Sequence, residues 1–272
     1  MERRVFRPGV VDMTQSDVVF SSEGPVAFFT LNRPSAGNAM TWAMYEALTA
    51  ACDRVDADQT ARVLVIRANG GAFSTGTDIS QFTSFASGHD GLEYERRLEA
   101  AVSRLERVGG PTIAQVEGAA AGAGFAIALA CDLRVCSPGA RFGVPIARTL
   151  GNALSIENCA RLVAHLGMTM TKDLLFTGRF CDAREAERIG FVTRVVDALQ
   201  VSNVVVELAM SMASHAPLTL RAMKAALRQV HALGAQDSQE VRDLIAACYA
   251  SHDFRHGVAA FLDKRPPSFE GQ

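Results

Sequence analysis

Residues 118–132 combine residue types that could hold a negatively charged group. Three glycines, Gly118, Gly122 and Gly124, are separated almost only by alanines, so the backbone can turn tightly and approach a ligand closely. The apolar run that follows, residues 125–131, is typical of a helix buried on all sides. Free N–H groups and the positive end of the helix dipole at its start would stabilise an anion. Alternatively, the small residues serve only close packing of a helix on a sheet.

A second glycine-rich segment, residues 69–79, follows a short apolar run at 62–68 that predicts a strand buried on both faces. A glycine-rich loop at the end of a strand is a usual ligand site in α/β proteins, although a plain turn has the same composition. The first stretch lacks the dinucleotide pattern GxGxxG, because Ile127 stands where the third glycine would be. An NAD-dependent dehydrogenase is therefore not supported.

Few side chains near these segments could transfer a proton. Asp78 lies in the second loop, where capping a turn is the alternative to catalysis. Glu157 lies in a predicted helix with Leu154 and Arg161 as neighbours, and this leaves it able to face either a pocket or solvent. The sequence shows no pattern typical of a Ser/His/Asp catalytic triad.

The elements that would position these residues alternate between strands and helices in the first part of the chain. A hairpin is expected from runs at 18–20 and 26–31, and Thr41 can cap a helix that ends near residue 56. Further strands are expected at 62–68, 112–116 and 133–136, with a mobile loop at 83–91 and a helix at 92–108. This alternation favours an α/β fold with right-handed crossovers.

The second part of the chain is almost wholly helical in pattern. Helices are predicted at 154–164, 169–176, 182–189, 201–214, 217–232, 237–250 and 253–262, with one short strand at 191–196. Asp182 and Glu185 have the spacing of a capping box at the start of the third of these helices. We therefore divide the chain into a poorly ordered lead-in at 1–17, a mixed core at 18–197 and a helical region at 198–272. The helical tail needs a cover for its apolar side, either its own core or another subunit.

Composition excludes several classes of function. With 272 residues, 49% of them hydrophobic, the chain can bury a full core. A net charge of −2 offers no basic field for nucleic acid. No run is long enough to span a bilayer and no signal peptide is evident, so we expect a cytoplasmic protein. The six cysteines are scattered without metal-ligand spacing, and neither a disulfide framework nor a metal site is predicted.

Five short segments, taken in order, together resemble the crotonase superfamily, also called the enoyl-CoA hydratase/isomerase family. The resemblance covers roughly residues 18–268. Its segments are 31–34 (LNRP) with 38–39 (NA), 73–79 (FSTGTDI), 118–132, 141–143 (RFG) and 261–265 (FLDKR).

The resemblance implies a crotonase fold of repeated ββα units with a helical C-terminal region, assembled as trimers that often pair into hexamers. It implies an oxyanion hole for a thioester oxygen, in which Thr77 and Ala123 each give one backbone N–H. A backbone donor tolerates Ala123 in place of the family's usual glycine. No covalently bound cofactor is expected, and coenzyme A enters as part of an acyl-CoA substrate.

For the coenzyme A portion, the resemblance implies contacts along residues 75–79 and at the Gly/Ala loop. Thr75, Asp78 and Ile79 would border the adenine, with Gly122 beside Ala123. The resemblance also implies that Lys264 reaches the CoA phosphates, either within its own subunit or across a subunit boundary. The alternative for Lys264 is a solvated charge beside Arg265.

The sequence departs from the family pattern at two positions. Hydratases of this family use two glutamates, which by position would stand at 126 and just after Pro145, where this chain has Ala126 and Ile146. Since general acid/base groups contribute about 10²- to 10⁴-fold each, two-glutamate hydration is disfavoured. Glu157 lies where other members place an acid/base residue. We therefore expect an enzyme of fatty-acid or acyl-CoA metabolism, a lyase or isomerase, with isomerase-like or other enolate chemistry favoured; the alternative is a non-catalytic acyl-CoA-binding protein.

Overall fold

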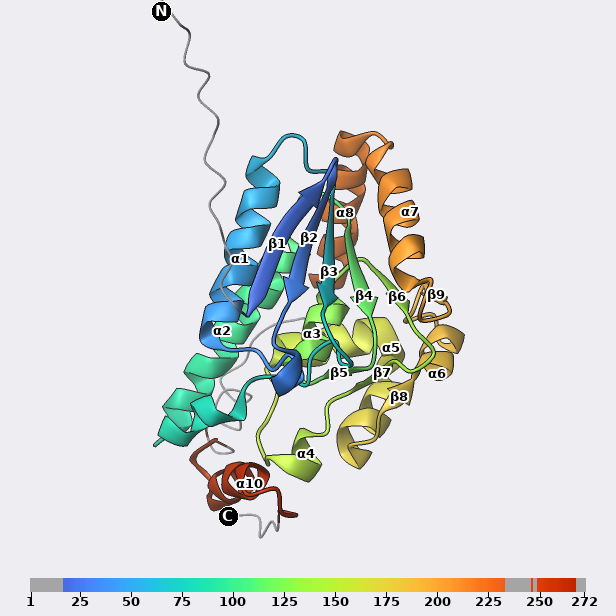
Figure 1. Ribbon diagram of the computed structural model, residues 1–272. Coiled ribbons are helices and arrows are strands. Elements are labelled where there is room, and N and C mark those ends of the chain that lie inside the picture. The colour runs from blue at the N-terminus through green and yellow to red at the C-terminus, as the bar shows by residue number, and fades with distance from the viewer. Residues whose placement is uncertain (1–16, 233–245, 247–248, 268–272) are drawn as a thin grey trace, which may run out of the picture.

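A computed structural model describes residues 17–232, 246 and 249–267. Its main sheet has six strands in the order β1-β2-β3-β4-β6-β9. All neighbouring pairs are parallel except the hairpin pair β1 and β2 (Figure 1). The strands are β1 (Val18–Glu23), β2 (Val26–Leu31), β3 (Val63–Ala68), β4 (Thr112–Val116), β6 (Leu133–Cys136) and β9 (Arg194–Val195).

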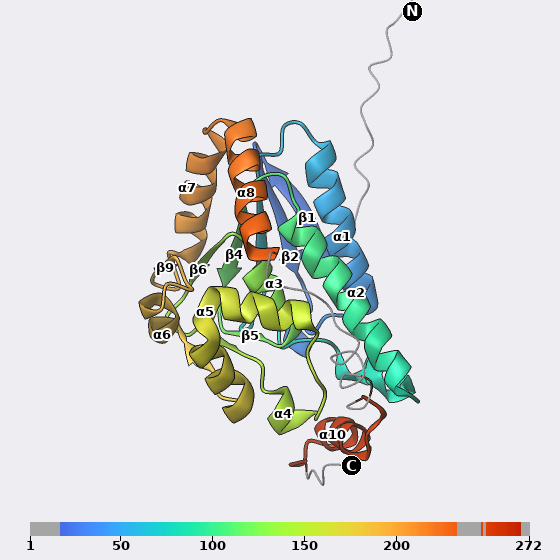
Figure 2. The ribbon, with the colours of Figure 1, turned by 180° about the vertical axis from the view of Figure 1, so that it is seen from behind.

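The central strands of this sheet, above all β2, are mostly apolar because both of their faces are buried. Successive side chains of a strand point to opposite faces, so Val26 and Phe28 enter one core while Ala27 and Phe29 enter the other. The smaller core lies against α7 (Val201–Ala213), whose Val205 is fully buried in it. The larger core lies under α1 (Trp42–Ala57), α2 (Gly88–Glu106) and α3 (Ala123–Ala130), and Figure 2 shows α1 and α2 covering the sheet from behind.

A second, three-stranded sheet holds the segments between the main strands. Its order is β5 (Ala119–Ala121), β7 (Arg141–Gly143) and β8 (Cys181–Asp182). The chain order β4-β5-α3 and β6-β7-α4, with α4 at Ile146–Thr149, repeats the order β1-β2-α1. This repetition agrees with the expected ββα units.

In the helical part of the chain, α7 and α8 (Pro217–Ala232) lie beside the upper part of the sheet in Figure 1, and α10 (His252–Leu262) lies at the bottom of the molecule. Past β9 every described element is a helix, although the placing of a domain boundary at residue 197 stays a prediction. Its helices α8 and α10 lie where helices were expected, and the predicted helix at 237–250 lies almost wholly outside the described residues. The helices not yet given are the 3-10 turns η1 (Pro34–Ala36) and η2 (Ile79–Ser84), with α5 (Ile156–Thr177) and α6 (Ala183–Arg188).

Local signals placed most helix ends correctly. Thr41 caps α1 by accepting a hydrogen bond from Met44 N at 3.3 Å, as predicted. Asp182 caps α6 through Glu185 N at 2.8 Å, again as predicted. The two helices expected at 154–164 and 169–176 are the two halves of α5, which is kinked at Gly167, where φ is 76°.

Two predictions about elements were wrong. The expected loop at 83–91 contains the last two residues of η2 and the first turn of α2. Gly88 and Gly91 serve close packing, since a Cβ at Gly91 would lie 1.9 Å from the Tyr249 ring. The strand expected at 191–196 is reduced to β9. Phe191 instead closes the end of α6, donating its N–H to Ala186 O at 2.9 Å, and packs against Phe125.

Candidate active site

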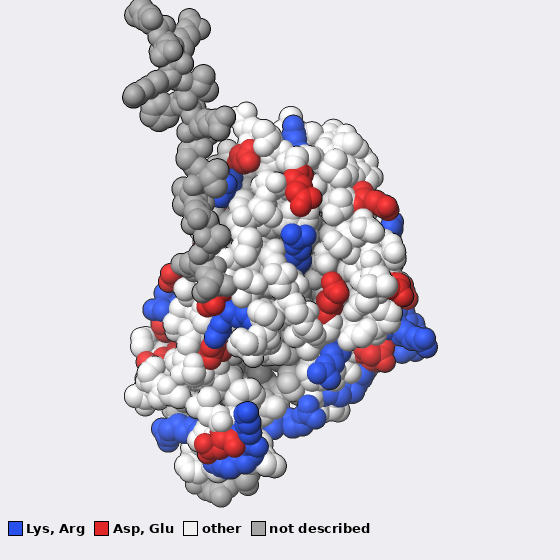
Figure 3. Space-filling view, viewed as in Figure 1, with Lys and Arg blue, Asp and Glu red and all other residues white. Residues whose placement is uncertain are grey.

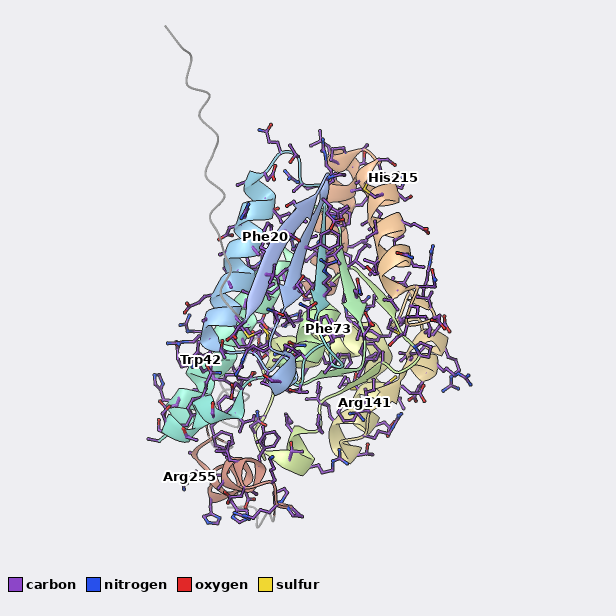
Figure 4. All side chains as sticks on the ribbon, viewed as in Figure 1. Phe20, Trp42, Phe73, Arg141, His215 and Arg255 are labelled. Carbon is purple, nitrogen blue, oxygen red and sulfur yellow. The ribbon has the colours of Figure 1, made fainter. Side chains whose placement is uncertain are left out.

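The two glycine-rich segments of the sequence meet beside the start of α3. Ser74 N donates to Ala119 O at 3.0 Å and Ala121 N donates to Ser74 O at 2.8 Å, so the loop after β3 runs alongside β5. A cleft of about 280 Å³ opens at this junction, and α4 and the end of α10 contribute to its walls. Phe73, labelled near the centre of Figure 4, lies within this loop, is fully buried and anchors it.

Gly76 is required at this junction both for its conformation and for space. Its φ is 109°, a value that residues with a side chain rarely adopt. A Cβ built on Gly76 would lie 3.3 Å from Ala121 O and 3.8 Å from Ala123 N. The peptide that joins Gly76 to Thr77 is therefore close to the first turn of α3.

Thr77 and Ala123 both line the cleft, and their N–H groups have no protein acceptor within the described part of the chain. For Ala123 the reason is its place as the first residue of α3, where an N–H has no partner inside its own helix. Two neighbouring amides are engaged: Asp78 N donates to Met40 O at 2.9 Å, and Gly122 N donates to Gly143 O at 2.9 Å. Two residues with unpaired backbone donors thus line one cleft.

The side chain of Thr77 holds its segment of the loop in place through buried hydrogen bonds. Its hydroxyl is within hydrogen-bond distance of Tyr45 Oη at 2.7 Å and of Tyr94 Oη at 2.9 Å, and all three side chains are buried. Burial raises the pKa of both phenols well above the ordinary value, so both stay protonated at neutral pH. The buried polar group therefore holds the Thr77 backbone without adding charge.

A smaller cavity of about 30 Å³ continues from the cleft and shares Gly122, Ala123 and Asn152 with it. This volume is enough for about one or two water molecules. Ala126 lines the smaller cavity and Ile146 lines both spaces. Neither side chain can transfer a proton, which is the departure noted in the sequence.

One carboxyl group lines the smaller cavity among the described residues, and sequence reasoning missed it. Glu95 of α2 is only 4% exposed. A signal was present, since Glu95 lies three residues before Leu98 and four after Gly91 on the buried stripe of the helix. Glutamate is rarely buried in proteins, so a glutamate on the apolar stripe of a helix indicates a candidate functional residue.

Glu95 is held by neutral hydrogen-bond donors. Ser155 N donates to Oε2 at 3.0 Å and Tyr249 Oη donates to Oε1 at 3.0 Å. Burial, followed by the nearby carboxylates Glu99 and Glu157, raises the pKa of Glu95 to about 8, and these effects exceed the two hydrogen bonds that lower it. Glu95 is therefore mostly protonated at pH 7.

Asn152 connects this carboxyl to the cleft. Its Nδ2 donates to Tyr249 Oη at 3.1 Å, and its Oδ1 is buried without a hydrogen-bond donor among the described residues. Buried polar atoms nearly always have a partner, so this oxygen is suited to accept a hydrogen bond from a bound molecule.

The residues predicted to hold coenzyme A lie at different distances from the cleft. Thr75, Asp78, Ile79 and Gly122 all line it. Asp78 also caps η2 through Ser80 N at 3.1 Å and pairs with Arg33 at 3.0 Å, so it has a structural role as well. Lys264 is exposed just past α10, whose Phe261 and Leu262 line the cleft.

Glu157 is separate from these walls. It lies half-buried in the first turn of α5 and lines neither cavity. Its proton-transfer role stays a prediction.

Metal binding, membrane crossing and thiol chemistry are three further possibilities for the chain. Within residues 17–232, 246 and 249–267, no group of three His, Cys, Asp or Glu side chains is arranged to hold a metal ion. No helix in the same described portion is both long enough and apolar enough to cross a membrane. The buried cysteines lie in apolar surroundings, and burial raises the pKa of Cys131 to about 12.

The order of strands and helices, the second small sheet and the helical C-terminal region define an α/β protein of the crotonase fold. The enoyl-CoA hydratase/isomerase family model matches residues 21–272, and the chain belongs to this family.

Similar proteins span nearly the whole chain. The 2,3-dehydroadipyl-CoA hydratase of Escherichia coli (strain K12) is 34% identical over 259 residues, which cover 94% of this chain and all of that protein. An enoyl-CoA hydratase/carnithine racemase structure from Magnetospirillum magneticum is 29% identical with a TM-score of 0.76, covering 94% of this chain and 96% of that one. A methylmalonyl-CoA decarboxylase complexed with 2S-carboxypropyl CoA is 26% identical with a TM-score of 0.87, covering 96% and 100% of the two chains.

Proposed function

We propose that the chain binds an acyl-CoA thioester in the cleft and stabilises its enolate through the N–H groups of Thr77 and Ala123. The observation that carries the proposal is the pair of unpaired backbone donors on the walls of one cleft. When a thioester forms an enolate, negative charge develops on its oxygen, and fixed donors stabilise that charge most where water is excluded. Each such donor typically contributes about 3–4 kcal/mol to lowering the barrier.

The coenzyme A portion would extend from the cleft toward α10. Thr75, Ile79 and Gly122 offer walls for it inside the cleft. Lysines and arginines gather along the lower edge of the molecule in Figure 3, and Figure 4 labels Arg141 and Arg255 in that part. Together with the exposed Lys264, this basic edge suits the phosphates of coenzyme A.

The reaction we favour is isomerisation or another enolate reaction within acyl-CoA metabolism. Hydration with two glutamates is disfavoured because Ala126 and Ile146 line the cavity with alkyl groups. The E. coli relative is named a hydratase, so the alternative reaction is hydration in which side chains other than those at 126 and 146 transfer the protons. Decarboxylation of an acyl-CoA α-carboxylate also belongs to the favoured class, since loss of CO₂ leaves the enolate without any base; one similar structure is a decarboxylase.

The same alkyl residues favour a second candidate, a non-catalytic acyl-CoA-binding protein. Such a protein would keep the cleft and its two donors and would release the thioester unchanged.

Binding and turnover measured together separate the two candidates. The purified chain is titrated with acetyl-, butyryl-, crotonyl- and methylmalonyl-CoA by calorimetry, and the same mixtures are followed by mass spectrometry. Conversion of any thioester supports the enzyme, whereas micromolar binding without conversion supports the binding protein. Absence of binding to the whole panel would contradict the thioester proposal itself.

We also propose that the chain self-associates, as a trimer or hexamer. Helix α8 exposes Leu218 by 77% and Leu227 by 70% in the single chain. A groove of about 480 Å³ beside it is lined largely by apolar side chains, including Leu129 and Met223. A contiguous apolar surface of this kind is typical of a subunit contact.

A further inference from the structure

The carboxyl of Glu95 differs from the other acidic groups on its helix. Glu99 and Glu106, further along α2, both form ion pairs with the buried Arg161. The distance from Arg161 Nε to Glu106 Oε1 is 2.6 Å. No cation pairs with Glu95 within the described part of the chain. A buried carboxyl without a cation is costly for a fold, so its presence at a cavity calls for a functional reason.

We propose that Glu95 is the catalytic residue that exchanges a proton with the α-carbon of the bound acyl group, an inference that rests on the proposed thioester site. Of the titratable side chains that line the smaller cavity, Glu95 is the one carboxyl and Tyr94 the one phenol. Tyr94 Oη is already within hydrogen-bond distance of Thr77, and burial keeps it protonated.

The cavity brings Glu95 to the same space as the proposed oxyanion donor. Glu95, Ala123 and Ala126 line this space of about 30 Å³ together. An α-carbon is bonded directly to the thioester carbon, so a thioester oxygen at Ala123 N places its α-carbon toward this space. The protein thus offers a proton-transfer group from α2 in place of side chains on α3 and α4.

The proton transfer balances without any further reactant. In one direction the neutral carboxyl protonates the α-carbon: the enolate electron pair forms the new C–H bond, the thioester C=O is restored, and Glu95 becomes a carboxylate. In the other direction the carboxylate takes the α-proton, the C–H electron pair becomes the new bond between the α-carbon and the thioester carbon, and the C=O π pair moves to the thioester oxygen. The two amide donors stabilise the negative charge on that oxygen in both directions.

Tyr249 and Asn152 are positioning residues for this carboxyl. Tyr249 Oη donates to Glu95 Oε1 and itself accepts from Asn152 Nδ2. The donor from Ser155 N occupies the other oxygen, so the carboxyl is held at both ends. Each oxygen keeps a second lone pair for a substrate proton.

Deuterium exchange into butyryl-CoA tests the proposal. The wild-type chain is incubated with butyryl-CoA in D₂O, α-deuterium is measured by mass spectrometry, and the Kd is measured by calorimetry. We expect Glu95→Gln to slow exchange by about 10²- to 10⁴-fold with the Kd changed less than about threefold. Glu95→Asp keeps the acid and should retain part of the rate. Glu46→Gln, an exposed change on α1, should leave both quantities unchanged.

The pH profile distinguishes proton transfer from a structural role. The wild-type exchange rate should rise with pH through a midpoint near pH 8 and level off above it, since removal of the α-proton needs the carboxylate and burial raises the pKa of Glu95 to about 8. The titratable groups that influence Glu95 from its own and neighbouring elements are Tyr94 and Glu99 on α2, Tyr45 on α1, Glu157 and Cys159 on α5, and Tyr249. Tyr249→Phe should shift the midpoint of the profile, whereas a purely structural role would leave it in place.

Each outcome of the exchange and binding measurements has one interpretation. Exchange by Glu95→Gln at the wild-type rate, or loss of exchange in Glu157→Gln alone, would overturn the assignment to Glu95. Binding of butyryl-CoA by the wild type without any exchange would overturn it as well, while leaving the thioester site intact. No binding by the wild type would refute the proposed function, and the Glu95 inference with it.

Discussion

Replacing Glu95 by glutamine should make the protein more stable near neutral pH, even where it removes activity. The folded chain binds the Glu95 proton more tightly than the unfolded chain does, because burial raises the pKa from the ordinary 4.5 to about 8. Below pH 4.5 the carboxyl is protonated in both states and costs nothing extra. As the pH rises from 4.5 to 8, the unfolded chain loses the proton first, and the folded state is progressively destabilised.

The size of the effect follows from that difference in pKa. One pKa unit corresponds to about 1.4 kcal/mol, so at pH 7 the carboxyl costs the fold roughly 3 kcal/mol, and at pH 8 and above roughly 4–5 kcal/mol. Glutamine has nearly the same shape and can keep one acceptor for the Tyr249 hydroxyl or the Ser155 N–H. It loses one of these two hydrogen bonds, which offsets about 1 kcal/mol of the gain.

Urea unfolding of wild type and Glu95→Gln from pH 4.5 to 8.5 measures this difference. Protein concentration is held fixed, because subunit association also contributes to stability. The variant should gain stability over the wild type at about 1.4 kcal/mol per pH unit between pH 5 and 8, with no gain at pH 4.5. The quantity to compare is the unfolding free energy of the variant minus that of the wild type. If this difference does not change with pH, or if it falls between pH 5 and pH 8, Glu95 is not a buried carboxyl with a raised pKa.

Three other substitutions probe the scaffold around the site. Thr77→Val removes the partner of two buried tyrosine hydroxyls and should cost about 1–3 kcal/mol, visible as a lower thermal midpoint; an unchanged midpoint would mean that these contacts are dispensable. Arg161→Met removes a buried cation from two partly buried carboxylates and should cost about 3–5 kcal/mol in urea. Arg179→Met at a half-exposed pair should cost less than about 1 kcal/mol, and equal costs would contradict the role of burial. Leu227→Glu should reduce the oligomer fraction in sedimentation velocity, and an unaltered distribution would exclude α8 from the subunit contact.

Periodicity and capping residues were sufficient to predict much of the fold. The strands β2 and β3 were visible as continuous apolar runs because both faces of the sheet are buried. The starts of α1 and α6 followed from Thr41 and Asp182, whose side chains bond to the first turn directly. Such signals depend on neighbouring residues alone, and they need no knowledge of the tertiary structure.

The errors arose where tertiary contacts decided the local structure. Gly88 and Gly91 suggested a loop, yet they begin α2 because only glycine allows the chain at residues 246 and 249 to pack so closely. Glu95 was not selected because a glutamate in an amphipathic helix usually faces solvent. Its burial depends on Ser155 and Tyr249, which are 60 and 154 residues away in the chain. No spacing rule could pair residues so far apart.

The proposed role of Glu95 would explain how this cavity supports enolate chemistry with alkyl residues at 126 and 146. The backbone donors of the proposed oxyanion hole are fixed by the course of the chain through Gly76 and the start of α3, so side-chain changes nearby leave them in place. A proton-transfer group has only to reach the α-carbon, and any wall of the cavity can supply one. Placing it on α2 requires a buried carboxyl without a cation, which destabilises the fold at neutral pH. A site that keeps such a residue while a glutamine of equal size would be more stable is best explained by a requirement for its proton.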